Sequence, residues 1–457
     1  MEDIRNYLIP GKKCHLIGIG GVSMSPLGEV LTSMGLRVCG SDMNDGDNVQ
    51  RLRNKNIHVI IGHAPENITG DVDFVVRTAA VHDDNPEVVA AKAQGIPVYE
   101  RTQAWGAIMK DYPNALCIAG THGKTTTTSM STHILMAAEK DPTVMIGGTL
   151  PLLHAGHRVG QGDTIIMESC EYYNSFLSFY PTVAVVLNVE ADHLDFFKDI
   201  EDIKHSFHEF VCHVPEDGCV VVNGDDENAM EVVKGVAAPV LTFGFSDRCD
   251  VWAKNIVQLG AQTDFDLMYK GRKFTHVSLR VPGLHNVSNA LAAAAACIFL
   301  GCGPLAVKYG LAAFTGAGRR FEFKGKFNGA DVYDDYAHHP GELKVLMDAV
   351  APLGYKRIIL VFQPHTYTRT NALFDDFVEQ LRRPDLTVLA EIYAAREKNT
   401  LGISSKDIAK EIPNSMYFAS FDEIETSLRY TAAPGDLILT VGAGDIYRVG
   451  ERLVEKK

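Results

Sequence analysis

Residues 117–127 read Cys117-Ile118-Ala119-Gly120-Thr121-His122-Gly123-Lys124-Thr125-Thr126-Thr127, an apolar run that enters a loop of two glycines, one lysine and a series of threonines. Glycines let backbone N–H groups converge on phosphate oxygens, a lysine supplies a mobile positive charge, and a hydroxyl directly after it can ligate Mg²⁺. The segment therefore predicts a strand, a triphosphate-binding loop and a helix, in a protein that uses ATP.

The spacing of this loop departs from the usual phosphate-binding pattern. That pattern has four residues between its glycines, whereas only Thr121 and His122 separate Gly120 from Gly123, and Ile118 stands where the outer glycine would fall. A tight strand-to-helix turn with a threonine cap is the alternative. The Gly-Lys-Thr order at the start of a helix favours phosphate binding, because a simple turn does not require it.

Length and composition are those of ordinary packed domains. The 457 residues indicate about three domains, and 46% apolar with 22% charged residues is a typical globular mixture. The net charge of −14 argues against nucleic acid as a partner, because Lys and Arg contacts to phosphates dominate that kind of binding.

The cysteines and the apolar segments bear on location. Nine cysteines, an odd number, have no zinc-site or redox spacing, so we expect reduced, mostly buried thiols. Residues 1–5 lack a signal pattern, and the apolar segment 289–300 is too short to span a bilayer. The sequence predicts a cytoplasmic protein without membrane insertion.

Short apolar runs alternate with helical patterns along the chain, and this alternation is typical of parallel βαβ units. A helix is expected near Asn85-Pro86-Glu87, where proline suits the first turn. Strands are predicted at residues 15–19, 37–42, 73–76, 164–167, 182–187, 219–222, 240–243, 357–362, 387–392 and 436–440. Between residues 251 and 281, short alternating runs indicate a small antiparallel sheet, either inserted or appended.

These patterns predict an α/β protein of three domains. Residues 1–112 would form a Rossmann-like domain, and residues 113–321 a central α/β domain of the P-loop ATPase type that carries the small antiparallel sheet. Residues 322–457 would form a C-terminal Rossmann-like α/β domain. The first boundary falls in the polar stretch around Pro113.

A first glycine cluster, Gly18-Ile19-Gly20-Gly21-Val22-Ser23-Met24, follows a predicted strand, and Asp42 ends the next strand. It is similar to a dinucleotide fingerprint, although Ser23 occupies the third glycine position. A diphosphate at this helix N-terminus needs the same backbone donors whether it belongs to NAD or to a UDP-sugar. Both ligands remain open at this point.

Polar residues also follow the strands of the central unit. Glu168 comes directly after one strand and would hold Mg²⁺ opposite the loop threonine, unless it is simply an exposed acid at a strand end. His193, in the run Asn188 to Asp195, is a metal ligand or a hydrogen-bonded histidine. Asn286 and Asn289 lie three apart on one helix face and suit a nucleobase edge, although Asn286 could be a helix cap.

In the third unit, the stretches Asp334-Asp335-Tyr336-Ala337-His338-His339-Pro340 and Gln363-Pro364-His365-Thr366-Tyr367-Thr368-Arg369-Thr370 follow predicted strands. Carboxyl ends of parallel strands are where an open α/β sheet binds ligands.

Together these stretches resemble the Mur ligase family over almost the whole chain, and within it the branch that attaches L-alanine to UDP-N-acetylmuramate. The shortened phosphate loop is the form this family uses. The motifs that carry the resemblance are Gly18-Ile19-Gly20-Gly21, Gly120 to Thr126, Glu168, Ala191-Asp192-His193-Leu194-Asp195, His285-Asn286 with Asn289, Gly318-Arg319-Arg320-Phe321, Asp334 to Pro340 and Gln363-Pro364-His365.

The resemblance implies roles for individual residues. The residues implied in catalysis are Lys124, Glu168, His193 and Arg320. Those implied in ATP binding are Gly120, Thr121, His122, Gly123, Lys124, Thr125, Thr126, Asn286, Asn289, Arg320 and Asp335. The implied Mg²⁺ ligands are Thr125, Glu168 and His193. The implied contacts to the UDP-substrate are Gly18, Gly20, Gly21, Ser23 and Asp42. The residues expected in an amino-acid and carboxylate pocket are His338, His339, His365 and Arg369.

The implied reaction uses ATP to phosphorylate the lactyl carboxylate of UDP-N-acetylmuramate, after which L-alanine attacks the acyl phosphate. A monomer or a homodimer is expected. The nearest alternative is the recycling ligase that joins a whole peptide to the same sugar. An NAD-dependent oxidoreductase would explain only residues 13–42, and a non-catalytic nucleotide-binding scaffold would not explain the polar residues at so many strand ends. Thr366 departs from the arginine that many family members have, which leaves its contact undefined.

Overall fold

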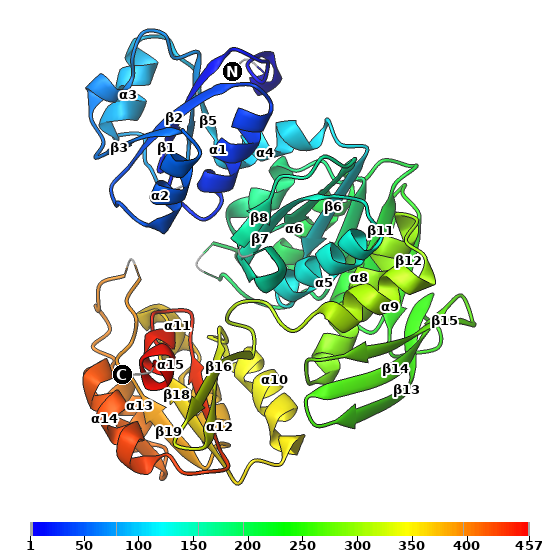
Figure 1. The fold of residues 1–457 in the computed structure, drawn as a ribbon, viewed down its shortest axis with the longest axis vertical. Helices are drawn as coiled ribbons and strands as arrows, with labels where there is room; N and C mark the ends of the chain where they lie inside the picture. The colour runs from blue at the N-terminus through cyan, green and yellow to red at the C-terminus, as the bar shows by residue number, and fades with distance from the viewer. Residues whose placement is uncertain (1–2, 79, 154, 195, 396, 456–457) are drawn as a thin grey trace. The chain divides into compact units, whose positions relative to one another are not determined.

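The computed structural model describes residues 3–455 except Ala79, His154, Asp195 and Arg396, so Asp195 of the histidine motif lies outside the described residues. It contains three sheets (Figure 1). The chain divides into two compact units. One comprises Met1–Lys254, Asp266–His276 and Ser288–Leu311, and the other comprises Asn255–Phe265, Val277–Val287 and Ala312–Lys457.

The first sheet has five parallel strands in the order β3-β2-β1-β4-β5. These strands are β1 (Lys13–Ile17), β2 (Arg37–Asp42), β3 (His58–Ile61), β4 (Phe74–Arg77) and β5 (Val98–Glu100). The helices are α1 (Met24–Ser33), α2 (Asp47–Asn54), α3 (Pro86–Ala93) and α4 (Arg101–Met109). The helix predicted at Pro86 is confirmed, with the Asn85 side chain accepting from the N–H of Glu87.

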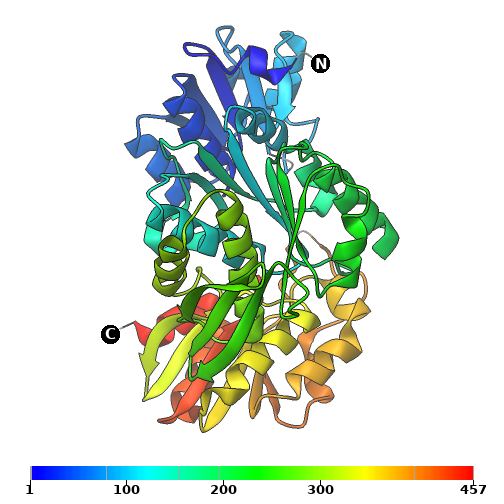
Figure 2. The same ribbon diagram turned by 90° about the vertical axis from the view of Figure 1, so that its right-hand side faces the viewer.

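Helices cover both faces of this sheet. Leu16 packs with residues of α1, α2 and α4 in one apolar cluster, whereas Ile17 packs with Val88 and Ala91 of α3 in another. Figure 2 shows the sheet, in blue, between these helices. Because β2 and β4 flank β1, the loops after β1 and β4 diverge at their carboxyl ends, which is where such a sheet binds ligands.

The middle sheet has ten strands in the order β15-β14-β13-β12-β11-β10-β6-β9-β7-β8. These are β6 (Asn114–Ala119), β7 (Thr143–Leu150), β8 (Ala155–Arg158), β9 (Thr164–Glu168), β10 (Val183–Val186), β11 (Cys219–Asn223), β12 (Val240–Gly244), β13 (Val251–Leu259), β14 (Gln262–Tyr269) and β15 (Arg272–Leu279). Its helices include α5 (Lys124–Ala137), α6 (Ile200–Val211), α7 (Glu227–Val232), α8 (Leu284–Phe299), α9 (Pro304–Ala313) and the 3-10 segment η4 (Tyr172–Ser178).

Two features of this sheet bear on the sequence predictions. The strands predicted around residues 164–167, 182–187, 219–222 and 240–243 are confirmed as β9, β10, β11 and β12. Of the two arrangements left open for residues 251–281, the strand order shows the appended one, since β13 pairs with β12 in parallel through Phe243–Val251 and Gly244–Trp252.

The third sheet has six strands in the order β16-β17-β21-β18-β19-β20, all parallel except β16. These are β16 (Glu322–Phe327), β17 (Ala330–Asp335), β18 (Arg357–Phe362), β19 (Leu386–Leu389), β20 (Ser415–Tyr417) and β21 (Asp436–Val441). The helices are α10 (Pro340–Val350), α11 (Tyr367–Ala372), α12 (Phe374–Leu381), α13 (Ser405–Lys410), α14 (Phe421–Thr431) and α15 (Tyr447–Val454). Because β21 lies between β17 and β18, the carboxyl ends of these three strands are neighbours.

Buried β-branched and aromatic side chains explain why these segments form strands. Ile359, Leu360, Val361 and Phe362 of β18 are fully buried, as are the residues of β10, and strands buried on both faces read as continuous apolar runs. Among the described residues, no helix is both long enough and apolar enough to cross a membrane.

Candidate active site

The predicted phosphate loop connects β6 to α5 at the centre of the middle sheet. Gly120 and Gly123 have φ values of +145° and +84°, which side-chain-bearing residues rarely adopt. The loop is fastened to the end of β10 by Asn188, whose Oδ1 accepts from the N–H of His122 at 2.8 Å and whose carbonyl accepts from the N–H of Thr121 at 3.1 Å. Asn188 was not predicted as a site residue, although it lies directly after a predicted strand.

Lys124, the first residue of α5, is held by a buried carboxylate. Its Nζ lies 2.9 Å from Oε2 of Glu171 and donates to the carbonyl of Thr121 at 3.2 Å. Burial alone would lower the pKa of Lys124, but the Glu171 carboxylate raises the pKa above its ordinary value. The lysine is therefore a fixed cation at the loop. Glu171 was not predicted as a site residue, although it lies three residues after Glu168.

Two of the three predicted Mg²⁺ ligands, Thr125 and Glu168, are in direct contact beside the loop. Thr125 Oγ1 donates to Glu168 Oε1 at 3.1 Å, while Glu168 Oε2 accepts from the backbone N–H of Gly147 at 2.7 Å. The third, His193, is next to Glu171 instead, with Nε2 3.7 Å from Oε1 of Glu171 and its ring stacked on Tyr172 at a centroid distance of 4.3 Å.

The oxygen donors of Thr125 and Glu168 fit Mg²⁺, which prefers hydroxyl and carboxylate ligands and takes the rest of its shell from phosphates and water. Within the part of the chain that the structure describes, no group of three or more His, Cys, Asp or Glu side chains is close enough to hold a metal by itself. A metal here would therefore depend on the hydroxyl of Thr125 and on the phosphates of the nucleotide.

The two amides have different surroundings. Asn289 Oδ1 accepts from Thr127 Oγ1 at 3.3 Å, and a Cβ on Gly123 would lie 2.5 Å from that oxygen, so glycine at this position permits the approach. Asn286 Nδ2 donates to the carbonyl of Pro282 at 2.7 Å within its own turn. The structure thus brings Asn289 to the phosphate loop, and the nucleobase role of both amides stays a prediction. Thr126 is buried in the first turn of α5.

The first glycine cluster forms a tight turn between β1 and α1. Gly18 has φ +78°, and the N–H of Gly21 donates to its carbonyl at 3.1 Å. Asp42 Oδ2 accepts from the N–H of Gly20 at 2.8 Å, and a Cβ at Gly20 would lie 2.9 Å from the same oxygen. The acid at the end of β2 therefore shapes the glycine turn directly.

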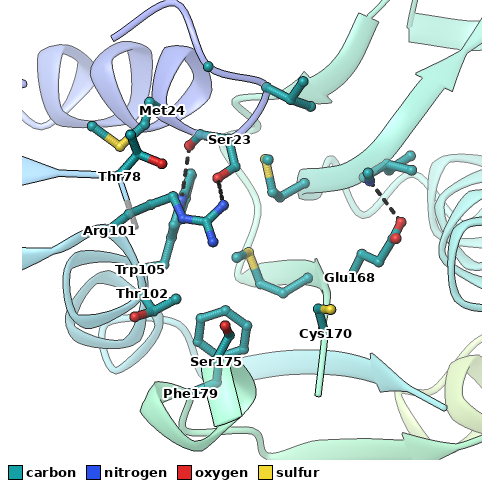
Figure 3. Close-up of a pocket in the computed structure, with 16 residues that line it drawn as sticks. Ser23, Met24, Thr78, Arg101, Thr102, Trp105, Glu168, Cys170, Ser175 and Phe179 are labelled. Carbon is teal, nitrogen blue, oxygen red and sulfur yellow. Dashed lines mark hydrogen bonds between the residues drawn. The ribbon is translucent and has the colours of Figure 1, made fainter. Parts of the chain in front are cut away.

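A cavity of about 240 Å³ joins this turn to the middle sheet (Figure 3). Arg101 of α4 donates to Ser23 Oγ, and Trp105 donates to the Ser23 carbonyl at 3.2 Å. Glu168 and Cys170 line the far side. Burial lowers the pKa of Arg101, and no ion pair between it and a carboxylate is found among the described residues. The cavity thus carries a partly buried cation next to a helix N-terminus, which suits an anionic ligand. Sequence reasoning missed Arg101, because only the fold brings it to Ser23.

In the third sheet, Asp335 lies at the end of β17. Its carboxylate accepts from the N–H groups of Phe321 and Ala337, both at 2.8 Å, so it fixes the segment that contains Arg320. Burial raises the pKa of Asp335, and the Arg320 charge opposes that rise. The Arg320 guanidinium carbon lies 4.7 Å from the centroid of the Tyr336 ring.

The predicted amino-acid pocket is partly assembled. The rings of His338 and His365 are 5.8 Å apart, and Arg369 Nη1 lies 3.5 Å from His365 Nδ1. Burial lowers the pKa of His338, and burial with the neighbouring charges lowers the pKa of His365 to about 4. His339 differs from the expectation in that Nδ1 accepts from the N–H of Gly341 at 3.2 Å and caps α10. Its pocket role stays a prediction.

Comparison with known proteins agrees with this arrangement. The family descriptions that match are "Mur ligase family, catalytic domain" at residues 13–113, "Mur ligase middle domain" at residues 118–297, and "Mur ligase, glutamate ligase domain" at residues 319–444. The UDP-N-acetylmuramate--L-alanine ligase of Agathobacter rectalis is 47% identical over 447 residues, 97% of each chain. The chain belongs to the Mur ligase family.

Other relatives include ligases with two different names. The UDP-N-acetylmuramate--L-alanine ligase of Acetivibrio thermocellus is 45% identical over 98% of this chain and 96% of its own. The structure of the UDP-N-acetylmuramate-alanine ligase of Thermotoga maritima superposes with a TM-score of 0.81 at 28% identity, covering 97% of this chain and 98% of that one. A murein peptide ligase from Psychrobacter arcticus gives a TM-score of 0.70 at 25% identity, with coverage of 97% and 98%.

Proposed function

We propose that this chain is an ATP-dependent ligase that joins the lactyl carboxylate of UDP-N-acetylmuramate to L-alanine, in the synthesis of peptidoglycan precursors. The observation that carries this function is the identity of 45 to 47% along nearly the whole chain to two ligases of that name. The likeness to a murein peptide ligase is weaker, at 25% identity, which favours a single amino acid over a peptide as acceptor.

The chemistry follows from what a carboxylate needs before an amine attacks it. An oxygen of the lactyl carboxylate attacks the γ-phosphorus of ATP, and ADP leaves, giving an acyl phosphate. The free amine of L-alanine attacks the acyl carbon, the C–O bond breaks, and phosphate leaves with the former carboxylate oxygen. Positioning and charge stabilisation supply most of the catalysis in phosphoryl transfer.

The residues of the phosphate loop suit the first step. The fixed cation of Lys124 would neutralise the β and γ phosphates, and Arg320 would contact the phosphates as a second cation. Thr125, Glu168 and His193 would hold Mg²⁺, which when bound offsets charge on the transferring phosphoryl group. Glu171 would keep Lys124 and His193 in place, because its two carboxylate oxygens face both of them.

The UDP-substrate would occupy the cavity, and L-alanine would bind at the carboxyl ends of strands in the third sheet. The segment from Gly21 to Met24 at the start of α1 and the Arg101 guanidinium would bind the anionic UDP-substrate, since both line the same cavity. Because the pKa of His365 lies near 4, that imidazole is neutral at pH 7 and does not repel an ammonium group. Arg369 is then the cation that would receive the carboxylate of L-alanine.

We propose three domains, residues 1–112, 113–321 and 322–457, which bind the UDP-substrate, ATP and the amino acid respectively.

The C-terminal domain would also close over the reacting groups, because water hydrolyses an acyl phosphate. Small-angle scattering profiles that do not change on adding an ATP analogue with the UDP-substrate would contradict closure. The cytoplasm is the proposed location and a monomer or homodimer the proposed assembly.

An isotope experiment tests the reaction itself. UDP-N-acetylmuramate labelled with ¹⁸O in the lactyl carboxylate is incubated with ATP, Mg²⁺ and L-alanine, and the released phosphate is examined by mass spectrometry. The proposed route transfers one labelled oxygen to each phosphate. Unlabelled phosphate would show that the carboxylate is never phosphorylated.

A further inference from the structure

Arg319 precedes the proposed catalytic Arg320, and its guanidinium gathers the ends of two strands. Nε donates to Oδ2 of Asp334 at 2.9 Å, at the carboxyl end of β17. Nη1 donates to the carbonyl of Gly444 at 2.9 Å, and Nη2 donates to the carbonyl of Gly442, both in the turn after β21. All three nitrogen atoms of the planar guanidinium therefore donate hydrogen bonds, which fixes its orientation.

Two aromatic rings complete this setting. The guanidinium carbon of Arg319 lies 4.6 Å from the centroid of the Tyr447 ring and 4.9 Å from that of Tyr336. The Tyr336 ring also lies beneath the guanidinium of Arg320, at 4.7 Å, and its centroid is 5.5 Å from the ring of His338. Tyr336 thus lies against both Arg319 and Arg320 and close to His338 of the predicted amino-acid pocket.

The backbone around Arg320 indicates why such an anchor is present. Arg319 has φ +59° and Phe321 has φ +47°, left-handed conformations that cost non-glycine residues free energy. Such conformations persist where the surroundings over-determine them, and they cluster at functional sites. The Arg319 side chain fixes one flank of Arg320, and the bond from the Phe321 N–H to Asp335 fixes the other.

We propose that Arg319 is a positioning residue for the phosphoryl-transfer step. It fixes the backbone next to Arg320 and the Tyr336 ring that contacts the Arg320 guanidinium, and so holds Arg320 in place. This inference rests on the proposed function, in which Arg320 contacts the phosphates of ATP. Arg319 itself touches no reacting group. Its contribution is to kcat through the placement of its neighbour.

The test compares Arg319→Lys with a matched control. Lysine keeps the charge but cannot serve three acceptors in a planar fork. Misplacement of a catalytic group by about 1 Å lowers a rate on the order of 100-fold, so we expect kcat to fall about 10- to 100-fold. The KM for UDP-N-acetylmuramate should stay within about twofold, since the first glycine turn is untouched.

Arg357→Lys is the control, because Arg357 forms a similar fork with a buried carboxylate in the same sheet. Its Nη2 donates to Asp436 at 2.6 Å and to the carbonyl of Thr431 at 2.8 Å, at the amino end of β18. It should lower the melting temperature by a similar amount while keeping kcat within about twofold of wild type. A kcat loss in Arg357→Lys that matches Arg319→Lys would mean a general stability effect and would overturn the proposal.

A second variant keeps the test decisive if Arg319→Lys does not fold. Tyr447→Leu removes one ring from Arg319 and leaves its hydrogen bonds, so kcat should fall several-fold at a temperature well below the melting point. Unchanged kcat in whichever variants fold would overturn the positioning role while leaving the proposed function intact. A wild-type enzyme without L-alanine-dependent phosphate release would overturn both.

Discussion

The backbone N–H of Gly147 donates to Oε2 of Glu168 at 2.7 Å and leaves Oε1 facing Thr125. A Cβ on Gly147 would lie 2.6 Å from Oε1, so any other residue here would push the Glu168 carboxylate away. A glycine on β7 thus sets the orientation of the carboxylate proposed to hold Mg²⁺.

Gly147→Ala should therefore displace Glu168. We expect kcat to fall about 10- to 100-fold and the Mg²⁺ concentration for half-maximal activity to rise, because a misplaced ligand weakens the metal site. Steady-state phosphate release against Mg²⁺ concentration measures both. Gly303→Ala is the control, since a Cβ there meets no atom within 4 Å. Normal Mg²⁺ dependence in Gly147→Ala would contradict this role.

Replacement of Arg101 should act on the UDP-substrate alone. In Arg101→Ala the KM for UDP-N-acetylmuramate should rise about 10- to 100-fold, which is the cost of losing a charged hydrogen bond of about 1.5 to 3 kcal/mol. The KM for ATP should stay within about twofold. Arg5→Ala serves as control, because Arg5 pairs with Asp3 at the surface. Equal effects on both KM values would contradict a role of Arg101 in binding the UDP-substrate.

Lys124 and Glu171 should give distinguishable defects. Lys124→Ala should abolish turnover while the dissociation constant for UDP-N-acetylmuramate, measured by calorimetry, changes little. Glu171→Gln removes the negative charge beside Lys124 and His193 but keeps the shape, so kcat should fall at least about 10-fold through loss of positioning. Wild-type turnover in Glu171→Gln would show that the Lys124–Glu171 pair has no part in catalysis.

Acid should destabilise the protein through His133 of α5, a residue that is 8% exposed and whose pKa is lowered by burial to about 4. The unfolded chain binds this proton more readily, with a pKa near 6.5. The stability that neutral His133 contributes is therefore present above about pH 6.5 and is lost as pH falls toward 4.

Urea unfolding at pH 7.5, 6.0 and 5.0 measures this effect. In His133→Gln the loss of stability below pH 6 should be shallower by about 1 kcal/mol per pH unit, near the limit for one proton. Removal of the exposed His58 should leave the wild-type slope. Parallel slopes for His133→Gln and wild type would contradict a neutral, buried His133.

The sequence predicted those parts of the fold and site that depend on local pattern. The strand at residues 357–362 and the helix after Asn85 follow from apolar runs and capping residues. The pairing of Thr125 with Glu168 was also predictable, because Glu168 ends one strand, the Thr125 loop follows another, and parallel strands end at one edge.

The contacts that sequence reasoning missed depend on the order of strands or on backbone atoms. Asn188 reaches His122 across 66 residues, because β10 lies beside β6 in the sheet. Gly147 acts through its N–H group, which residue type does not reveal. His339 was grouped with His338 by sequence, yet its ring caps α10 because proline follows it at the first helical position.

The acceptor specificity is the central claim, and phosphate release tests it most directly. The enzyme is incubated with UDP-N-acetylmuramate, ATP and Mg²⁺ against a panel of single amino acids and the tripeptide L-alanyl-γ-D-glutamyl-meso-diaminopimelate. We predict release that requires the UDP-substrate and is stimulated by L-alanine, with no stimulation by the tripeptide. Stimulation by the tripeptide alone would move the chain to the recycling ligases, and release that no amino acid or peptide stimulates would contradict the ligase function.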